Sequence, residues 1–408
     1  MLDQRVNEAI RVLWMSTEYD RSNDIKKMLE EAAAEKDGDA CLLLSRCYGG
    51  ACFIPEKFNF EEDDVKCEEY LDMSIRYGSA LGMFAARRLA GYTPPNNTFI
   101  HEPYHSNHEI WDAVLSLAKE NEPFSQYLIA NAYYYGDCIE LMDMDEEVLS
   151  TPRGIVILNQ FMDEAEIWFE ACIRQGFRLA IGNYVDLLTS GDYGREINKE
   201  KAWEMKIIGA DYGYEEYQAL VGDYLALKDP EKAKEYLDAA LAQGNKEALF
   251  GYGMIYGIEG KNPDLVKSNK YFEEGLQANA WSVSCKNRLA QNYFHGGYGI
   301  EADPAKAFSY VADLEDSNDW ASDIRGICYL HGWGVAPNYE KAKQQLEIYS
   351  GDKVNAIGLG EIYAYGLGVP VDIAKGMQYW NKFPDDPKVI EHKKNFKKGL
   401  FGWKRISK

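Results

Sequence analysis

The stretches ASDIRGICYLHGWGV, residues 321–335, and NAIGLGEIYAYGLGV, residues 355–369, are two copies of one pattern. In both copies a tyrosine stands eight positions after the first residue (Tyr329, Tyr363), and a glycine follows three positions later. Apolar residues in steps of three and four that end at a glycine are typical of one short helix. Each copy therefore predicts a helix that ends at its glycine.

A second helix is predicted to follow each copy. Asn338 and Asp372 come shortly after the glycine-rich turn, and a lysine stands three residues after each of them. Asn and Asp side chains cap helices by accepting a hydrogen bond from a backbone N–H that has no partner in the first turn. The repeating unit is thus a helical hairpin of about 35 residues, a period typical of helical repeat arrays.

The same pattern recurs along the whole chain. Its opening position, usually a small residue, is found at Ala40, Ala80, Ser125, Ala180, Glu216, Ala248, Cys285, Ala321 and Asn355. The Asn/Asp-x-x-Lys motif recurs at Asn198, Asp229, Asp264 and Asp303. Four residues after the lysine comes an aromatic residue, which helical spacing predicts to face the neighbouring hairpin: Tyr236, Tyr271, Tyr310 and Tyr379.

The combined pattern, Ala-x3-Leu-Gly-x2-Tyr-x2-Gly-x-Gly-Val-x2-Asp-x2-Lys-Ala, resembles the Sel-like repeat, a relative of the tetratricopeptide repeat. Residues 285–380 match it well, 180–276 moderately and 38–176 only in outline. The resemblance implies an all-α fold, an α/α solenoid wound as a right-handed superhelix of about nine helical-hairpin repeats. It also implies that the first helices line a concave face and that the protein serves as an adaptor.

Four segments of the chain differ in pattern. We predict an N-terminal helical cap (1–37) with helices near 3–17 and 24–36, divergent repeats with long inserted loops (38–176), regular Sel-like repeats (177–383) and a basic amphipathic tail (384–408). The inserted loops are 49–64, 93–108 and 137–153, and they either carry function or are tolerated insertions.

The composition limits the classes of partner. A formal net charge of -22 argues against nucleic acid, because binding there depends on Lys and Arg that neutralise phosphates. The sequence has neither the apolar core of a signal peptide nor a window long enough to span a membrane. Its eight cysteines form no Cys-x-x-Cys pair and are predicted to be reduced core residues. We therefore predict a cytoplasmic protein.

Chemical motifs are scarce. The one histidine cluster, His101, His105 and His108, lies near Glu102 and Glu109, a composition that can bind zinc. Pro103 interrupts any helix that would align these side chains, so we predict a solvated loop. We predict no catalytic residue, no metal and no cofactor. The alternative is an enzyme or small-molecule binder, metal-dependent or hydrolase-like, that uses the 93–108 loop.

The C-terminal tail is basic, whereas the rest of the chain is acidic. Eight basic residues between 385 and 408 alternate with apolar ones, including Val389, Ile390, Phe396, Leu400 and Phe401. This pattern favours a basic amphipathic helix. Such a helix either caps the open end of the array or binds an anionic membrane surface or a partner.

The main hypothesis is a non-enzymatic scaffold that binds a protein or peptide, with a preference for basic ligands. In related tetratricopeptide arrays, ligands contact first-helix positions between the core residues. Transferred to this chain, those positions, together with one tyrosine of the run 133–135, predict contacts at Tyr127, Asn131, Tyr134, Asp186, Gln218, Asn287, Gln291, Asp323 and Glu361. Within that run Tyr133 is assigned to the core and Tyr134 to an exposed contact.

Overall fold

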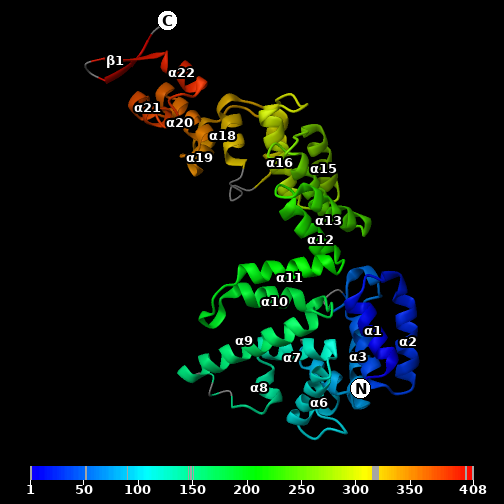
Figure 1. The fold of residues 1–408 in the computed structure, drawn as a ribbon. Coiled ribbons are helices and arrows are strands. Elements are labelled where there is room, and N and C mark those ends of the chain that lie inside the picture. Colours follow the sequence, from blue (N-terminus) through cyan, green and yellow to red (C-terminus); the bar gives the residue numbers. More distant parts are fainter. Residues whose placement is uncertain are drawn as a thin grey trace. The chain divides into compact units, whose positions relative to one another are not determined.

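The computed structural model describes residues 2–50, 53–89, 91–145, 147, 149, 151–314, 321–399 and 402–406. The chain forms two compact units, Met1–Gln218 (unit 1) and Ala219–Lys408 (unit 2). The secondary structure of the described part of both units is mostly α-helical, and a single two-stranded sheet is found in it (Figure 1). The predicted all-α fold is confirmed.

Unit 1 begins with two helices, near the predicted positions, and continues with four helical hairpins. The opening helices are α1 (Gln4–Met15) and α2 (Ser22–Ala34). The hairpins are α3 (Gly38–Tyr48) with α4 (Asp64–Arg76), α5 (Ala80–Ala86) with α6 (Asn107–Lys119), α7 (Pro123–Tyr135) with α9 (Pro152–Ile173), and α10 (Leu179–Ser190) with α11 (Lys199–Asp211). The inserted loops contain short helical turns, of which the longest is α8 (Cys138–Leu141).

Unit 2 contains five hairpins and the tail. The first helix, α12 (Glu215–Leu225), starts just before the unit boundary and pairs with α13 (Pro230–Ala242). The others are α14 (Ala248–Tyr256) with α15 (Leu265–Gln277), α16 (Ser282–His295) with α17 (Pro304–Val311), α18 (Ser322–His331) with α19 (Tyr339–Ile348), and α20 (Lys353–Tyr365) with α21 (Ile373–Trp380). The first helices of the nine hairpins in the described residues begin within three residues of the nine predicted opening positions, which confirms an α/α solenoid.

In four hairpins of unit 2, the same three types of residue connect the first helix to the second: a tyrosine, an Asn or Asp, and a lysine. In the α16–α17 hairpin, the backbone N–H of Asp303 donates to the carbonyl of Tyr293 at 2.7 Å, and its carboxylate accepts from the backbone N–H of Lys306 at 2.9 Å. The Lys306 ammonium lies 3.9 Å from the centre of the Tyr293 ring and donates to its hydroxyl. This Tyr–Asx–Lys closure recurs, as caps and cation–π contacts, at Tyr256–Asp264–Lys267, Tyr329–Asn338–Lys341 and Tyr363–Asp372–Lys375.

The aromatic residue after the lysine completes the closure. Tyr310 stacks on Tyr293 with ring centres 5.9 Å apart, and the same stacking is seen for Tyr271 on Tyr256 and Tyr379 on Tyr363. The prediction that these rings face the neighbouring hairpin was incomplete, because each ring also stacks on a tyrosine of its own hairpin. The antiparallel turn places them against the first helix of their own hairpin. The hydroxyl of Tyr310 in addition donates to Glu273 of the preceding hairpin.

Glycines in the first helices allow the second helices to approach closely. A Cβ atom at Gly360 would lie 2.2 Å from the indole nitrogen of Trp380, and one at Gly253 would lie 2.3 Å from the ring of Phe272. Both distances are far below van der Waals contact, so a side chain at either position would force the helices apart. The indole N–H of Trp380 also donates to the carbonyl of Ile357 at 3.1 Å.

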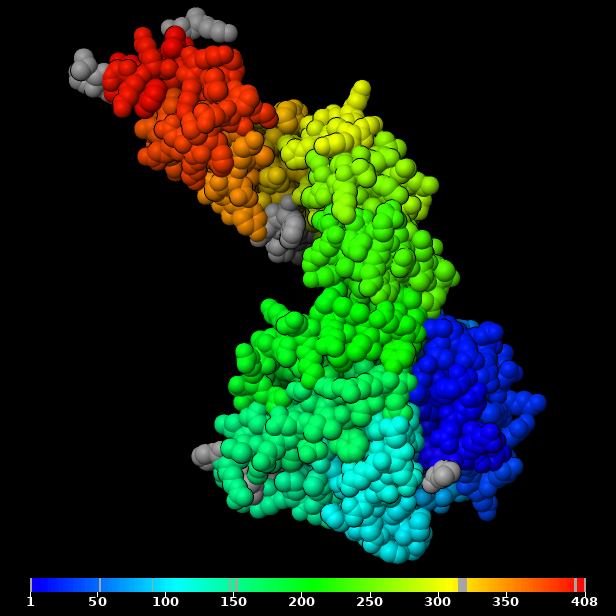
Figure 2. Space-filling view, in the orientation of Figure 1, coloured from blue at the N-terminus to red at the C-terminus, as the bar shows by residue number. Residues whose placement is uncertain are grey.

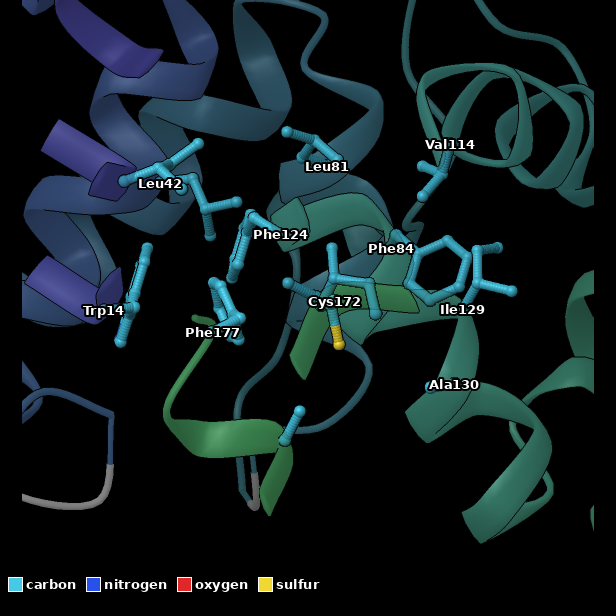
Figure 3. Close-up of a cluster of buried hydrophobic side chains, with 14 of the residues drawn as sticks. Trp14, Leu42, Leu81, Phe84, Val114, Phe124, Ile129, Ala130, Cys172 and Phe177 are labelled. Carbon is cyan, nitrogen blue, oxygen red and sulfur yellow. The ribbon is translucent and has the colours of Figure 1, made fainter. Parts of the chain in front are cut away.

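Aromatic side chains form the centre of unit 1 (Figure 3). The rings of Trp14 and Phe124 stack with centres 4.9 Å apart, and Phe177 packs against both. Trp14 comes from α1 and Phe124 from α7, so the N-terminal helix is part of the core. The indole N–H of Trp14 donates to the carbonyl of Phe53 at 2.8 Å, and this hydrogen bond holds the inserted loop after α3.

A buried ion network explains why one opening position is a glutamate. Arg178, which is 6% exposed, contacts the carboxylate of Glu215 at 2.8 Å and that of Glu216 at 2.9 Å. Its guanidinium also donates to the hydroxyl of Tyr19 at 2.7 Å. Glu216 occupies a position that is alanine in five of the other eight repeats, and its carboxylate helps to neutralise a guanidinium that the fold buries.

The tail is only partly helical. A short helix, α22 (Pro387–Lys393), is followed by a hairpin of β1 (Phe396–Gly399) and β2 (Gly402–Arg405), paired antiparallel. The expectation of one amphipathic helix was wrong, because two glycines flank the turn and Gly402 has a positive φ of 106°. Leu400, Phe401 and Lys408, which belonged to that prediction, and Cys52 lie outside the described residues.

The tail covers the last hairpin. Val389 and Phe396 are buried against Trp380, and the His392 ring stacks on Trp380 with centres 5.0 Å apart. In Figure 2 the red atoms of the tail form one continuous surface with the last helices of unit 2. This packing favours the capping interpretation, since these two apolar side chains point into the protein.

The cysteines of the described residues are core residues, as predicted. Seven of them are free and buried, and burial raises the pKa of the Cys41, Cys138, Cys285 and Cys328 thiols to about 12. These thiols stay protonated at neutral pH and behave as small apolar side chains.

The Tyr–Asx–Lys closure predicts a specific effect on stability. Asp303→Ala removes the cap acceptor, so we expect the free energy of unfolding to fall by about 1 kcal/mol. Asp303→Asn retains an acceptor oxygen and should lose only a small part of this. Urea unfolding followed by circular dichroism would compare the midpoints and slopes, since a repeat array need not unfold in one step. Equal losses in both variants would contradict a role for the hydrogen bond.

Candidate functional site

A groove on the first-helix face of unit 2 is the larger of two candidate sites. It has a volume of about 480 Å³. Its apolar surface comes from Phe294, Ile327, Val354 and Ile357, which belong to α16, α18 and α20. Its polar surface comes from His295, His331, Lys353, Glu361 and the start of α22 at Asp386 and Lys388. We refer to it as the α16–α20 groove.

Glu361 lies at the end of this groove nearest the tail. Its side chain is 12% exposed, and its carboxylate lies 3.0 Å from Nε2 of His392 and 3.8 Å from Nε2 of His331. The other nitrogen of His392, Nδ1, lies 3.3 Å from the hydroxyl of Tyr365. The tail therefore supplies a partner to a residue that the sequence predicted as a ligand contact, and α22 forms one wall of the groove.

Asp323 on α18 carries a negative charge that nearby positive groups compensate only in small part. One of its oxygens accepts the backbone N–H of Ile324 at 2.7 Å. Burial raises the pKa of this carboxyl, and the Ile324 N–H and the nearby His295 only partly oppose the rise. A half-buried carboxylate without a fully charged partner favours a cation or a hydrogen-bond donor beside it.

Asp223 on α12 is also a half-buried carboxylate, and it was not among the contacts predicted from the sequence. Burial raises the pKa of Asp223 from 3.8 to about 6, and Arg288 of α16 opposes this rise. Arg288 itself pairs with Glu259 at 2.8 Å, so its charge is shared. Asp223 stands seven positions after the opening residue Glu216, one position beyond the predicted set, so a search of the next position would have found it.

A smaller cavity of about 270 Å³ lies on the first-helix face of unit 1. Helices α3, α5, α7 and α10 contribute to its wall. Two of the predicted residues, Tyr127 and Asn131, line it. The Asn131 side-chain oxygen accepts from the amide of Asn183 at 2.7 Å, and burial raises the pKa of Tyr127. Two arginines that were not predicted, Arg46 and Arg88, also line this cavity.

The remaining predicted residues differ in their exposure. Asp186 is exposed and Gln291 is half-buried. Gln218 is 7% exposed, its amide donates to the carbonyl of Ala210 at 3.4 Å, and Asn287 is 8% exposed. Burial leaves Gln218 and Asn287 little exposed surface, and neither lines the two candidate sites, so their role as ligand contacts stays a prediction. Inward-facing amides can also satisfy backbone groups of neighbouring helices.

The tyrosine run at the end of α7 was assigned incorrectly. Tyr134, predicted as the exposed contact, is half-buried and packs edge-on against Phe169. Tyr135 is 53% exposed, and the Arg88 guanidinium lies 4.0 Å from the centre of its ring. Because α7 ends at Gly136, the last tyrosine turns outward.

The histidine cluster of the 93–108 loop does not converge on one point. His105 lies 3.8 Å from Glu102, and His108 lies 3.6 Å from Asp112, and all four side chains are more than half exposed. No group of three or more His, Cys, Asp or Glu side chains suited to a metal ion is found among the residues that the structure describes. The same part of the chain contains no helix long and apolar enough to cross a membrane.

Nine stacked hairpins with candidate sites on their first helices define a helical-repeat protein. The Sel1 repeat family model matches six segments of the chain, at residues 123–144, 218–245, 246–279, 283–311, 325–344 and 356–383. The chain therefore carries six Sel1 repeats, and the resemblance found in its sequence is confirmed.

Two solved structures were found to be similar. One is a protective antigen of uropathogenic Escherichia coli with an SLR fold, 16% identical, with 90% of this chain and 89% of that chain covered and a TM-score of 0.43. The other is a Sel1 repeat protein from Oxalobacter formigenes, 17% identical, with the same coverage and a TM-score of 0.37. A search of curated proteins found no match.

The carboxyl group of Asp223 makes stability depend on pH. Its folded pKa of about 6 lies above the ordinary value of 3.8, so the folded state prefers the protonated form. The contribution of this group to stability is therefore full below pH 3.8 and is lost as the pH rises through 6. We expect Asp223→Asn to change stability little near pH 4 and to raise it by roughly 1–3 kcal/mol at pH 7.

Urea unfolding at several pH values would measure this difference, and a carbon-13 NMR titration of Asp223 would report its pKa directly. Glu235→Gln is the matched control, because Glu235 is an exposed carboxylate on α13. An Asp223 pKa near 4, or the same pH profile for both variants, would contradict the assignment.

Proposed function

We propose that this protein is a non-enzymatic scaffold that binds a partner protein through a segment of extended peptide in the α16–α20 groove. Sel1 repeats generally bind other proteins, and this is the class of function that the family supports. The observation that carries the finer proposal is an apolar floor, built by three consecutive first helices, with charged side chains along its edge. An extended peptide can place alternate side chains on such a floor while its backbone remains near the polar edge.

The charge of this face favours a basic segment with an apolar anchor. Asp323 on α18 and Asp223 on α12 lie on first helices of this unit, outside the residues that line the groove; burial raises the pKa of both carboxyls, Arg288 only partly opposes the rise at Asp223, and the whole chain carries a net charge of -22. A lysine or arginine of the partner would supply the missing charge, and an apolar side chain would cover Ile327 and Ile357. Trp333, which is 37% exposed at the groove, is suited to contact an aliphatic or cationic side chain.

We propose no catalytic role for the groove. Its acid, Glu361, is held by two histidines, and the described residues that line the groove include no serine, threonine or cysteine as a hydroxyl or thiol nucleophile. The buried, free cysteines of the described residues suit a reducing compartment, and we propose that the protein lies in the cytoplasm. Contact of the basic tail with a membrane surface stays a prediction, separate from this proposal.

A peptide-display selection against the purified full chain tests the proposed function. We expect enriched peptides to combine Lys or Arg with a large apolar residue, and their binding to weaken at high salt. Asp323→Asn should weaken the binding of a selected peptide about threefold to tenfold, which corresponds to one charge-assisted contact near the surface. Fluorescence anisotropy with a labelled peptide would measure this.

Glu340→Gln is the control, because Glu340 is an exposed carboxylate on the second helix α19, whereas Asp323 is a half-buried carboxylate on the first helix α18, near His295 of the groove lining. Circular dichroism and thermal melting of both variants would show that they fold. Enrichment of acidic peptides, or equal binding by the two variants, would contradict a basic segment in the α16–α20 groove.

A further inference from the structure

The smaller cavity of unit 1 contains a buried guanidinium without a carboxylate partner. Arg46 of α3 is 6% exposed, and its Nη2 donates to the carbonyl of Ala85 at 3.3 Å. Its Nη1 has no hydrogen-bond partner among the described residues. One face of the guanidinium is covered by Phe53, whose ring centre lies 4.1 Å away. The charge of Arg46 is thus held in an apolar, aromatic environment.

No other group of the cavity supplies the missing charge. The second arginine, Arg88, is neutralised by Asp137 at 2.6 Å and also lies 3.5 Å from the carbonyl of Asn131. Burial lowers the pKa of Arg46 to about 10, and none of the groups that shift this pKa is a carboxylate. The described lining residues include no Asp or Glu. One positive charge therefore remains uncompensated inside the cavity.

Such an arrangement is costly unless something neutralises it. A buried cation without a partner destabilises a fold, whereas a guanidinium facing a carboxylate can form two parallel charge-assisted hydrogen bonds. The rest of the wall is suited to the body of an organic acid: Trp14, Phe124, Leu128 and Leu179 are apolar, and the amides of Asn131 and Asn183 provide polar groups. Trp14 and Phe124 are the stacked rings of Figure 3.

We propose that this cavity is a binding site for a carboxylate that carries an aromatic or branched apolar group. Arg46 pairs with the carboxylate, and the rings of the wall contact the apolar group. A single guanidinium matches one negative charge, and a volume of about 270 Å³ suits a ligand smaller than a nucleotide. The carboxylate belongs either to a free organic acid or to the C-terminal residue of a polypeptide. This site is in unit 1 and is independent of the α16–α20 groove.

Isothermal titration calorimetry with the full chain tests the proposal. The probes are phenylacetate, its neutral analogue 2-phenylethanol, and inorganic phosphate. We expect phenylacetate to bind with a dissociation constant of about 1 mM or tighter and the other two to bind at least about tenfold more weakly. Equal binding of 2-phenylethanol, preferential binding of phosphate, or no binding of phenylacetate would overturn the proposal.

Two substitutions in the cavity and one outside it connect the binding to Arg46. Arg46→Met removes the charge and keeps the length of the side chain, so binding should fall by about tenfold or more while the melting temperature does not decrease. Asn131→Asp keeps the acceptor for Asn183 and places a negative charge in the cavity, which should compete with the ligand to a similar extent. Arg76→Met is the control, since Arg76 is 60% exposed on α4.

Unchanged binding in Arg46→Met, or an equal loss in Arg76→Met, would contradict a role for Arg46. If Arg46→Met does not fold, Asn131→Asp decides, and full binding by that variant would also overturn the proposal. The source of the carboxylate is distinguished by N-acetylphenylalanine and its amide. Tighter binding of N-acetylphenylalanine than of phenylacetate, lost in the amide, assigns the site to a chain terminus. The reverse order assigns it to a free acid.

Discussion

The contact between a tyrosine, an Asn or Asp cap and a lysine is the constraint on which the regular hairpins of unit 2 depend. At Tyr293, Asp303 and Lys306 one backbone hydrogen bond joins the end of the first helix to the start of the second. A cap then fixes the second helix, and an ammonium group covers the ring. Each part is worth about 1 kcal/mol or less in isolation. Together they fix the angle of the hairpin through contacts within the hairpin itself.

This local closure explains how much of the fold could be predicted. The opening positions and the caps are short-range features, and all nine hairpins of the described residues begin within three residues of the predicted positions. Glu216 and the tail were harder to predict because their reasons are not local. Glu216 compensates Arg178, which lies 38 residues earlier in the chain. The tail leaves the helical path at its glycines and buries Val389 and Phe396 against Trp380, a contact that helical periodicity does not describe.

The candidate sites were predicted less well for a related reason. The repeat rule selects positions on the inward side of each first helix, and it placed Tyr127, Asn131 and Glu361 at cavities. It cannot separate a ligand contact from an amide that satisfies a neighbouring helix, as Gln218 does with Ala210. Arg46 stands six positions after Ala40, the same spacing as Asn131 after Ser125. It was not predicted because the N-terminal repeats match the repeat pattern only in outline. Its importance becomes visible only when burial and the lack of a carboxylate are known.

The first-helix faces of the two units carry buried charges of opposite sign. In both, packing between the first and second helices stabilises the array, so the first-helix faces can carry side chains that do not improve packing. In unit 2 these side chains include Asp223 and Asp323, whose burial favours a cation. In unit 1 they include Arg46, whose burial favours an anion. Buried charges of this kind lower stability, and a solenoid can tolerate them because each repeat is supported mainly by its neighbours. The uncompensated groups are therefore the places where a partner would gain most from binding.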